Sequence, residues 1–199
     1  MSRLPTPRSG RAAALRIRVA ALAALIALAV PGTSTAGHHD ESPFAARAGL
    51  ALATSAASAW AGDAYLVYVE NDEPLGADGA APRWGYLFHS PTLDRSRAWS
   101  LAGGRIVTAE NLPMAFDAPP VAGGWIDSDA ARRAGEAAAQ EYCSKEGGTL
   151  STMLLLRGAF DDADPDATTW TLVFTAPKAP SLFVMVDAAT GKVRRTWRG

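Results

Sequence analysis

The chain is poor in the residues that build disulfide frameworks, metal centres and catalytic dyads. Cys143 is the single cysteine among 199 residues, so no intramolecular disulfide can form. Only three histidines occur, His38, His39 and His89. No C-x-x-C, H-E-x-x-H, G-x-S-x-G or glycine-rich phosphate-binding motif is present. These absences leave no catalytic constellation in the sequence, which therefore predicts a non-enzymatic protein without a cofactor.

Long apolar runs are also scarce, and the only prominent one lies near the N-terminus, from Val19 to Val30. Five arginines precede it, and Pro31, Gly32 and the small residues 34–36 follow it. This order is typical of a secretory signal peptide. As a helix the run reaches only about 18 Å, at about 1.5 Å per residue, whereas a bilayer core is about 30 Å thick. We therefore expect a signal peptide over residues 1–36, cleaved after Ala36, and a secreted or periplasmic product that no longer contacts the membrane; a retained anchor is the alternative.

Positive charge is scarce in the remainder of the chain. Five of the 19 Lys+Arg lie in residues 1–36 and none of the 20 Asp+Glu does, so the mature chain has 14 basic and 20 acidic residues, a net charge of −6. A nucleic-acid-binding domain would be basic and would cluster its Lys and Arg residues. The composition therefore argues against a nucleic-acid partner.

The chain repeats itself at a spacing of 86 residues. Seven residues recur at this distance: Ser42, Arg47, Gly49, Gly62, Trp84, Phe88 and Pro91 recur as Ser128, Arg133, Gly135, Gly148, Trp170, Phe174 and Pro177. Self-similarity at one period is the signature of a duplicated structural unit. We expect a first unit over residues 37–110 and a second over 126–199, joined by a linker, 111–125, that holds three prolines and two glycines.

Each expected unit begins with a helix and continues with strands. Ser42 and Ser128 are favourable N-cap residues, and glycines at 62 and 147–148 favour helix ends there. Alternating apolar residues then predict strands over 64–70, 84–88, 97–101 and 105–108, and over 150–157, 170–174, 181–186 and 192–196. Gly49 and Gly135 predict that each helix lies very close to a sheet. The fold class we expect is α+β: two repeated units, each with one helix packed on a three- to four-stranded antiparallel sheet.

The second unit ends in a Val-Asp-x-x-Thr-Gly-x-Val pattern, over residues 186–193, that follows an Ala-rich helix. In this order the unit resembles the PepSY family, and the resemblance implies a PepSY/cystatin-like arrangement of each unit. The first unit keeps only Gly103-Gly104-Arg105-Ile106 at the equivalent hairpin. The resemblance implies a small extracytoplasmic α+β domain related to segments of protease propeptides, with proposed roles in protease inhibition or peptide binding. It brings no catalytic residues.

One metal site follows from the predicted cleavage. If the mature chain begins at Gly37, its amine, two backbone nitrogens and the imidazole of His39 form a square-planar set that suits Cu(II) or Ni(II). The candidate metal residues are therefore Gly37, His38 and His39. The run Asp162, Asp164 and Asp166 has the spacing of an EF-hand loop but lacks its glycine and glutamate, so we expect a solvated acidic loop.

Two single residues have structural interpretations. Cys143 corresponds to Ala57 in the first unit and is expected to be a small packing residue. His89 ends a strand, on the face opposite Trp84, and is expected to be a surface or interface residue and not a catalytic base.

Three functional hypotheses are compatible with the sequence. The first is a non-enzymatic extracytoplasmic protein that binds a protein or peptide, including a protease, through an exposed sheet face or edge. The second is a structural or assembly module of the cell envelope without inhibitory activity. The third is an enzyme whose carboxylates the sequence does not pair. The first is the predicted function, with no prediction of oligomeric state.

Overall fold

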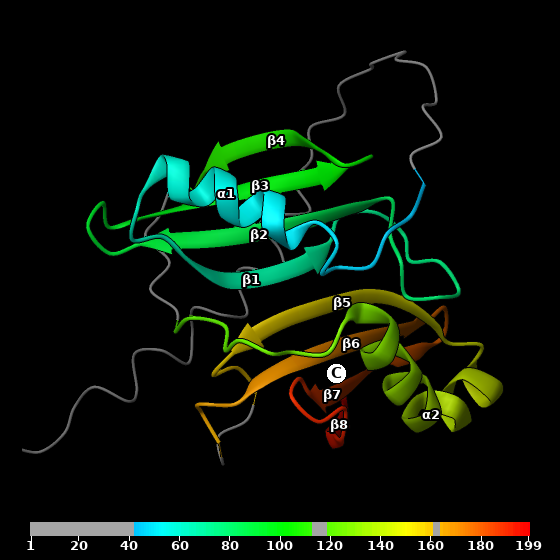
Figure 1. Ribbon diagram of the computed structural model, residues 1–199. Coiled ribbons are helices and arrows are strands. Elements are labelled where there is room, and N and C mark those ends of the chain that lie inside the picture. Colours follow the sequence, from blue (N-terminus) through cyan, green and yellow to red (C-terminus); the bar gives the residue numbers. More distant parts are fainter. Residues whose placement is uncertain (1–41, 113–118, 161–163) are drawn as a thin grey trace, which may run out of the picture. The chain divides into compact units, whose positions relative to one another are not determined.

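The computed structural model describes residues 42–112, 119–160 and 164–199, which contain two helices and eight strands (Figure 1). The elements are α1 (Leu50–Trp60), β1 (Tyr65–Asn71), β2 (Arg83–Ser90), β3 (Arg95–Ala102), β4 (Arg105–Asn111), α2 (Ser128–Glu146), β5 (Thr149–Arg157), β6 (Thr168–Ala176), β7 (Ala179–Asp187) and β8 (Val193–Arg198). The predicted leader, residues 1–36, lies outside this part of the chain, as do Gly37, His38 and His39.

All eight strands form one antiparallel sheet in the order β4-β3-β2-β1-β5-β6-β7-β8. The fold-class prediction of two repeated helix-on-sheet units is therefore wrong, because β1 pairs with β5 and merges the strands into one sheet. The physical reason is visible in the two joining strands. Val67 to Val69 and Met153 to Leu156 are buried without alternation, which is typical of central strands covered on both faces.

Both helices pack on one face of the sheet and enclose the main core (Figure 1). The alternating residues of β2 and β6 form its centre, and all are at most 2% exposed: Trp84, Tyr86, Phe88, Trp170, Leu172 and Phe174. Trp84 and Trp170 meet edge-to-face with ring centroids 6.2 Å apart. The predicted core face of these two strands is confirmed.

The predicted close approach of helix to sheet is confirmed at both glycines. A Cβ on Gly135, in α2, would overlap Leu172, and one on Gly49, which caps α1, would overlap the hydroxyl of Tyr86. Any side chain at either position would force the helix away from the strand beneath it.

The predicted start of the first helix is wrong. Helix α1 begins at Leu50, and the backbone of Phe44 instead forms an antiparallel bridge with Ala81, at 3.0 and 3.1 Å. Ser128, expected to cap α2, accepts the Ala46 N–H at 3.1 Å, and Asp127 caps the helix. Contacts with segments 37 and 82 residues away have taken the groups that local capping would use.

The predicted end of the second helix is confirmed, because α2 ends at Glu146 and Gly147 adopts the left-handed conformation, with φ of 69°. Within the described ranges, neither helix is long and apolar enough to span a membrane.

Candidate functional site: sheet edges, a pocket and a buried carboxylate pair

The sheet has two outer strands, β4 and β8, and no strand of the described residues pairs with their outer edges. The Gly199 N–H donates to the Ser181 oxygen at 3.1 Å, which continues the register of β7 with β8. Alternate residues of an antiparallel strand point their N–H groups to opposite sides. The N–H groups of Thr196 and Arg198 therefore point outward, away from β7.

The same argument applies to β4. The Leu112 N–H donates to the Ser96 oxygen at 2.9 Å, in register with the β3–β4 ladder. The outward N–H groups of this edge are therefore those of Ala109 and Asn111. Both residues are exposed, as is most of β4.

An aromatic cluster adjoins the β8 edge on the face opposite the helices. The rings of Phe183 and Trp197, on paired strands, are stacked with centroids 5.1 Å apart and an interplanar angle of 8°. Phe160 lies against Trp197 at 5.8 Å, and the Arg195 guanidinium lies 5.2 Å from the Trp197 centroid. Phe160 is 40% exposed and has a φ of 61°, a backbone conformation that bulky residues rarely adopt.

The arginines of β8 differ in their ion-pair partners. Arg194 pairs with Asp164 and with Asp187, each at 3.0 Å, and Arg198 pairs with Glu146 at 3.7 Å. Arg195, on the face opposite the helices, forms no ion pair in the described part of the chain; its guanidinium lies against the Trp197 ring and donates to the Phe160 carbonyl oxygen. Arg195 is therefore a cation that can accept a carboxylate.

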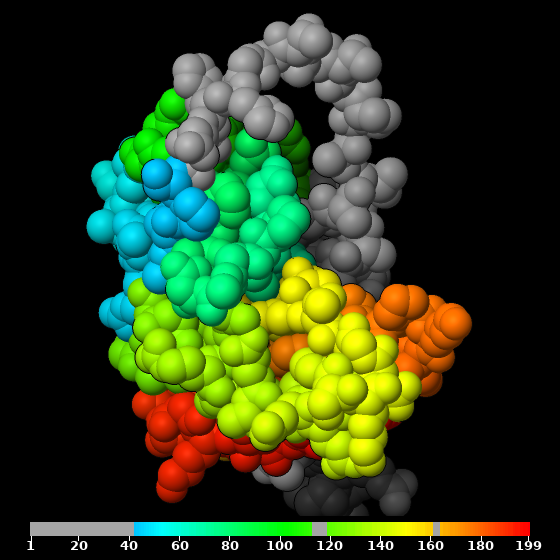
Figure 2. Space-filling view, turned by 90° about the vertical axis from the view of Figure 1, so that its right-hand side faces the viewer, coloured from blue at the N-terminus to red at the C-terminus, as the bar shows by residue number. Residues whose placement is uncertain are grey.

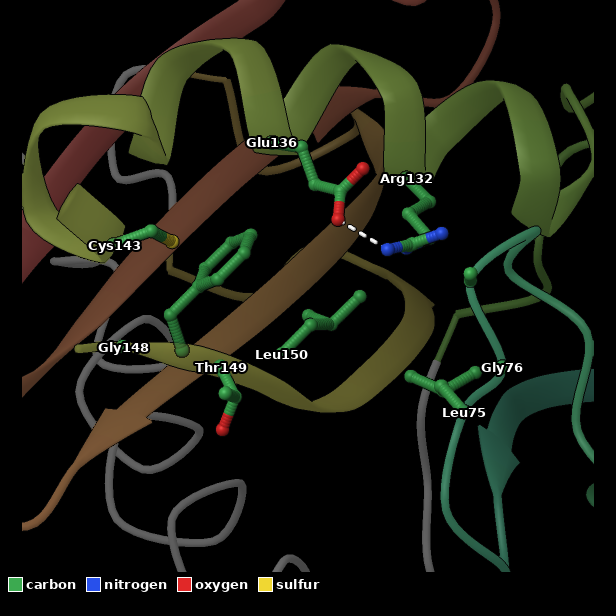
Figure 3. A pocket seen from close by; sticks show the side chains of 10 residues that line it. Leu75, Gly76, Arg132, Glu136, Cys143, Gly148, Thr149 and Leu150 are labelled. Carbon is green, nitrogen blue, oxygen red and sulfur yellow. Dashed lines mark hydrogen bonds and ion pairs between the residues drawn. The ribbon is translucent and has the colours of Figure 1, made fainter.

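A pocket of about 350 Å³ lies beneath α2 (Figure 3). Arg132, Glu136 and Cys143 extend into it from the helix, and Leu75 and Leu150 line the opposite walls. Its other lining residues are Gly76, Ala77, Gly148, Thr149 and Phe174. Arg132 and Glu136 form an ion pair with each other, so the pocket offers no net charge to a ligand.

Two glycines fix the walls of this pocket. Gly79, with φ of 78°, lets the loop between β1 and β2 pass close to the start of α2, because a Cβ at this position would lie 3.0 Å from the Asp129 Cα. Figure 2 shows this teal loop lying against the lime-green helix. At the other end, a Cβ on Gly148 would overlap the Tyr142 ring.

Cys143 lines this pocket and is partly exposed, so the expectation of a plain packing residue is only partly met. Burial, and then the charge of Glu136, raise the pKa of its thiol. A raised pKa leaves the thiol protonated near neutral pH, whereas a cysteine nucleophile needs the thiolate.

Two carboxylates, those of Glu70 in β1 and of Asp72 just after it, are partly buried on the face opposite the helices. Tyr68 donates a hydrogen bond to Glu70, and Ser100 donates one to Asp72. Burial, reinforced by the charge of Glu70, raises the pKa of Asp72 to about 7, and burial also raises the pKa of Glu70. The absence of a side chain on Gly85 makes room for Asp72, because a Cβ there would lie 2.7 Å from its Oδ1.

The structure separates the other residues that the sequence singled out. His89, expected at the surface or at an interface, is not at the surface; it is 4% exposed, and its Nδ1 lies 3.1 Å from the Ser96 hydroxyl. Asp164 and Asp166 pair with Arg194 and Arg157 respectively, which agrees with a loop that is not a calcium site, while Asp162 lies outside the described residues. No group of three or more His, Cys, Asp or Glu side chains converges in the described ranges.

No protein-family model and no curated protein sequence matches the chain. A solved structure of a predicted lipoprotein from Clostridium difficile 630 is similar over 75% of this chain and 92% of that chain, with 12% identity and a TM-score of 0.48. The PepSY resemblance stays a prediction.

Sequence reasoning missed the buried carboxylates and the aromatic cluster. The period-two pattern of β8 does place Arg195 and Trp197 on one face, and that signal was available. The contact with Phe160 was not available, because it joins residues 37 positions apart through a loop.

Proposed function

We propose that the chain is a secreted or periplasmic, non-enzymatic protein that binds an extended segment of a protein or peptide partner at an edge of its sheet. The observation that carries the proposal is the pair of exposed outer strands, whose outward backbone groups have no strand partner among the described residues. Such an edge can accept an extended peptide as an additional strand, with main-chain hydrogen bonds for affinity and side-chain contacts for specificity. The predicted leader supports the location.

The proposal is tested by selecting binders from a display library of random decapeptides with protein that begins at Gly37. Amide hydrogen exchange, followed by NMR, then reports which backbone groups the selected peptides protect. We expect slower exchange at Ala109 and Asn111 or at Thr196 and Arg198, because the N–H groups of these residues point outward on the two edges. Peptides that bind without protecting either set, or a selection that yields no binder, would refute edge binding.

Protease regulation is the finer form of this proposal and comes from the PepSY resemblance. Its test is the activity of a secreted metalloprotease with added protein. Loss of activity at stoichiometric protein supports inhibition. Full activity at a molar excess refutes inhibition, and a partner recruited without loss of activity favours the envelope-assembly alternative.

A further inference from the structure

We propose that β8 is the edge that binds the partner, and that the partner segment carries an aromatic side chain and a carboxylate two residues apart. This inference rests on the proposed function and deepens it by naming the edge and the chemistry of the ligand. It follows from the aromatic cluster of Phe160, Phe183 and Trp197 together with Arg195, which we call the β8 platform.

The platform is an unfinished aromatic stack at the margin of the sheet. Phe183 and Trp197 stack across β7 and β8 at 5.1 Å, and the next position in this row belongs to whatever strand adds to β8. Residues directly opposite on neighbouring strands have Cβ atoms about 4.5–5.5 Å apart. An aromatic residue opposite Trp197 would therefore continue the stack, and aromatic pairs of this kind prefer centroid separations of about 4.5–7 Å.

The charge of the platform selects the second side chain. Arg195 stands two residues before Trp197 on the same face and has no carboxylate partner in the described residues. In an antiparallel arrangement, the residue opposite Trp197 comes first and the residue opposite Arg195 follows two positions later. The favoured sequence is thus aromatic-x-acidic, with the acidic residue forming an ion pair on the face opposite the helices.

The conformation of Phe160 is an independent observation that points to the same place. This residue is 40% exposed and has a positive φ of 61°, which is an unfavourable backbone conformation for a bulky side chain. Strained residues of this kind occur disproportionately where a ligand is held. Its ring lies 5.8 Å from the Trp197 ring, between centroids, and so adds to the apolar surface of the β8 platform.

The same charges argue against a second copy of this chain as the occupant. Pairing β8 with β8 would bring two copies of Arg195 to neighbouring strands without a carboxylate partner among the described residues, and like charges on neighbouring strands are destabilising. Positively charged side chains are also a common protection of edge strands against self-association. An acidic partner segment gains from the charges that repel a second copy.

The probe is the capped heptapeptide Ac-Thr-Val-Tyr-Val-Asp-Val-Thr-NH2, titrated into protein that begins at Gly37 and followed by NMR. Two control peptides replace Tyr with Ala or Asp with Lys. We expect each control to bind about tenfold more weakly, and Arg195→Glu to reverse the preference between Asp and Lys. Equal binding of all three peptides would overturn the assignment of the platform.

Matched proline variants identify the edge. Thr196→Pro removes an outward N–H of β8, and Ala109→Pro removes one of β4, so neither costs a bond of the existing sheet. We expect Thr196→Pro to abolish peptide binding and Ala109→Pro to leave the affinity unchanged. The reverse result would refute β8 while preserving edge binding as the function.

Hydrogen exchange in the unmodified protein keeps the test independent of how the variants fold. Slower exchange at Thr196 and Arg198 with bound peptide supports the proposal. Protection confined to Ala109 and Asn111 overturns the choice of edge. A bound peptide that protects neither pair overturns the proposed function as well.

Discussion

Replacing Asp72 with asparagine should remove a pH-dependent loss of stability. Asp72 has a pKa of about 7 in the folded chain and a usual value of 3.8. Because the folded state holds this proton more tightly, the unfolded state binds fewer protons between these two values. Stability therefore falls as the pH rises from about 4 to 7.

The size of the effect follows from the shift in pKa. A rise from 3.8 to about 7 is about 3 pKa units, and at 1.36 kcal/mol per unit this corresponds to about 4 kcal/mol. The penalty is absent below pH 4 and complete above pH 7. Asparagine is close in shape and can still accept the hydrogen bond from Ser100, so Asp72→Asn should lack the penalty.

The assay is urea unfolding followed by tryptophan fluorescence, with both proteins measured at intervals from pH 4 to pH 8. At pH 4, the difference in unfolding free energy between the variant and the native chain reports the altered hydrogen bonding. Between pH 4 and pH 8 this difference should change in favour of the variant by about 4 kcal/mol, and the change reports the charge on Asp72. A difference that stays constant across this range would refute the assignment.

Asp63→Asn is a matched control of opposite sign. Hydrogen bonds from the Ser90 hydroxyl, at 2.6 Å, and from the Thr92 N–H, at 2.8 Å, lower the pKa of Asp63 to about 2. This group stabilises the fold above pH 4, and the contribution is lost only as the pH falls towards 2. The variant should be less stable than the native chain by a constant amount from pH 5 to pH 8.

Three further predictions use the same unfolding assay or a simple chemical one. Gly135→Ala should destabilise the fold by about 1–3 kcal/mol, because the new methyl group would overlap Leu172. Gly123→Ala, which has open space around its Cβ, is the neutral control. Equal stability of the two variants would contradict the close packing at Gly135. Tyr86→Phe should cost about 1–3 kcal/mol, because it leaves the Ala46 carbonyl without its 2.6 Å hydrogen bond; an unchanged urea midpoint would contradict this. Cys143 should react with iodoacetamide more slowly than the thiol of glutathione does at pH 8, since the pKa of the Cys143 thiol is raised. Equal reaction rates of Cys143 in the folded and in the unfolded chain would refute the raised pKa.

Local patterns predicted most of the secondary structure. Alternation placed Trp84, Tyr86 and Phe88 on one face, and all three lie in the core. The end of α2 followed from Gly147, whereas Asp127 caps the helix in place of the expected Ser128. These features depend on side-chain periodicity and on the conformational freedom of glycine, which neighbouring residues determine.

Tertiary contacts overruled local signals at the first helix. Ser42 followed by Pro43 is a favourable helix start, yet the Phe44 backbone pairs with Ala81 and α1 begins later, at Leu50. A local cap contributes only about 1 kcal/mol, so a bridge and a hydrogen bond from a distant segment can outweigh it.

What the sequence by itself determined is therefore the set of strands, the faces they bury and the second helix. Only the tertiary structure decided that β1 pairs with β5, that Asp72 is buried beside Glu70, and that Phe160 meets Trp197. Strand pairing is made by backbone groups that every residue carries, so sequence alone does not specify which edges meet. A pKa depends in turn on burial and neighbouring charge, and these exist only once the chain has folded.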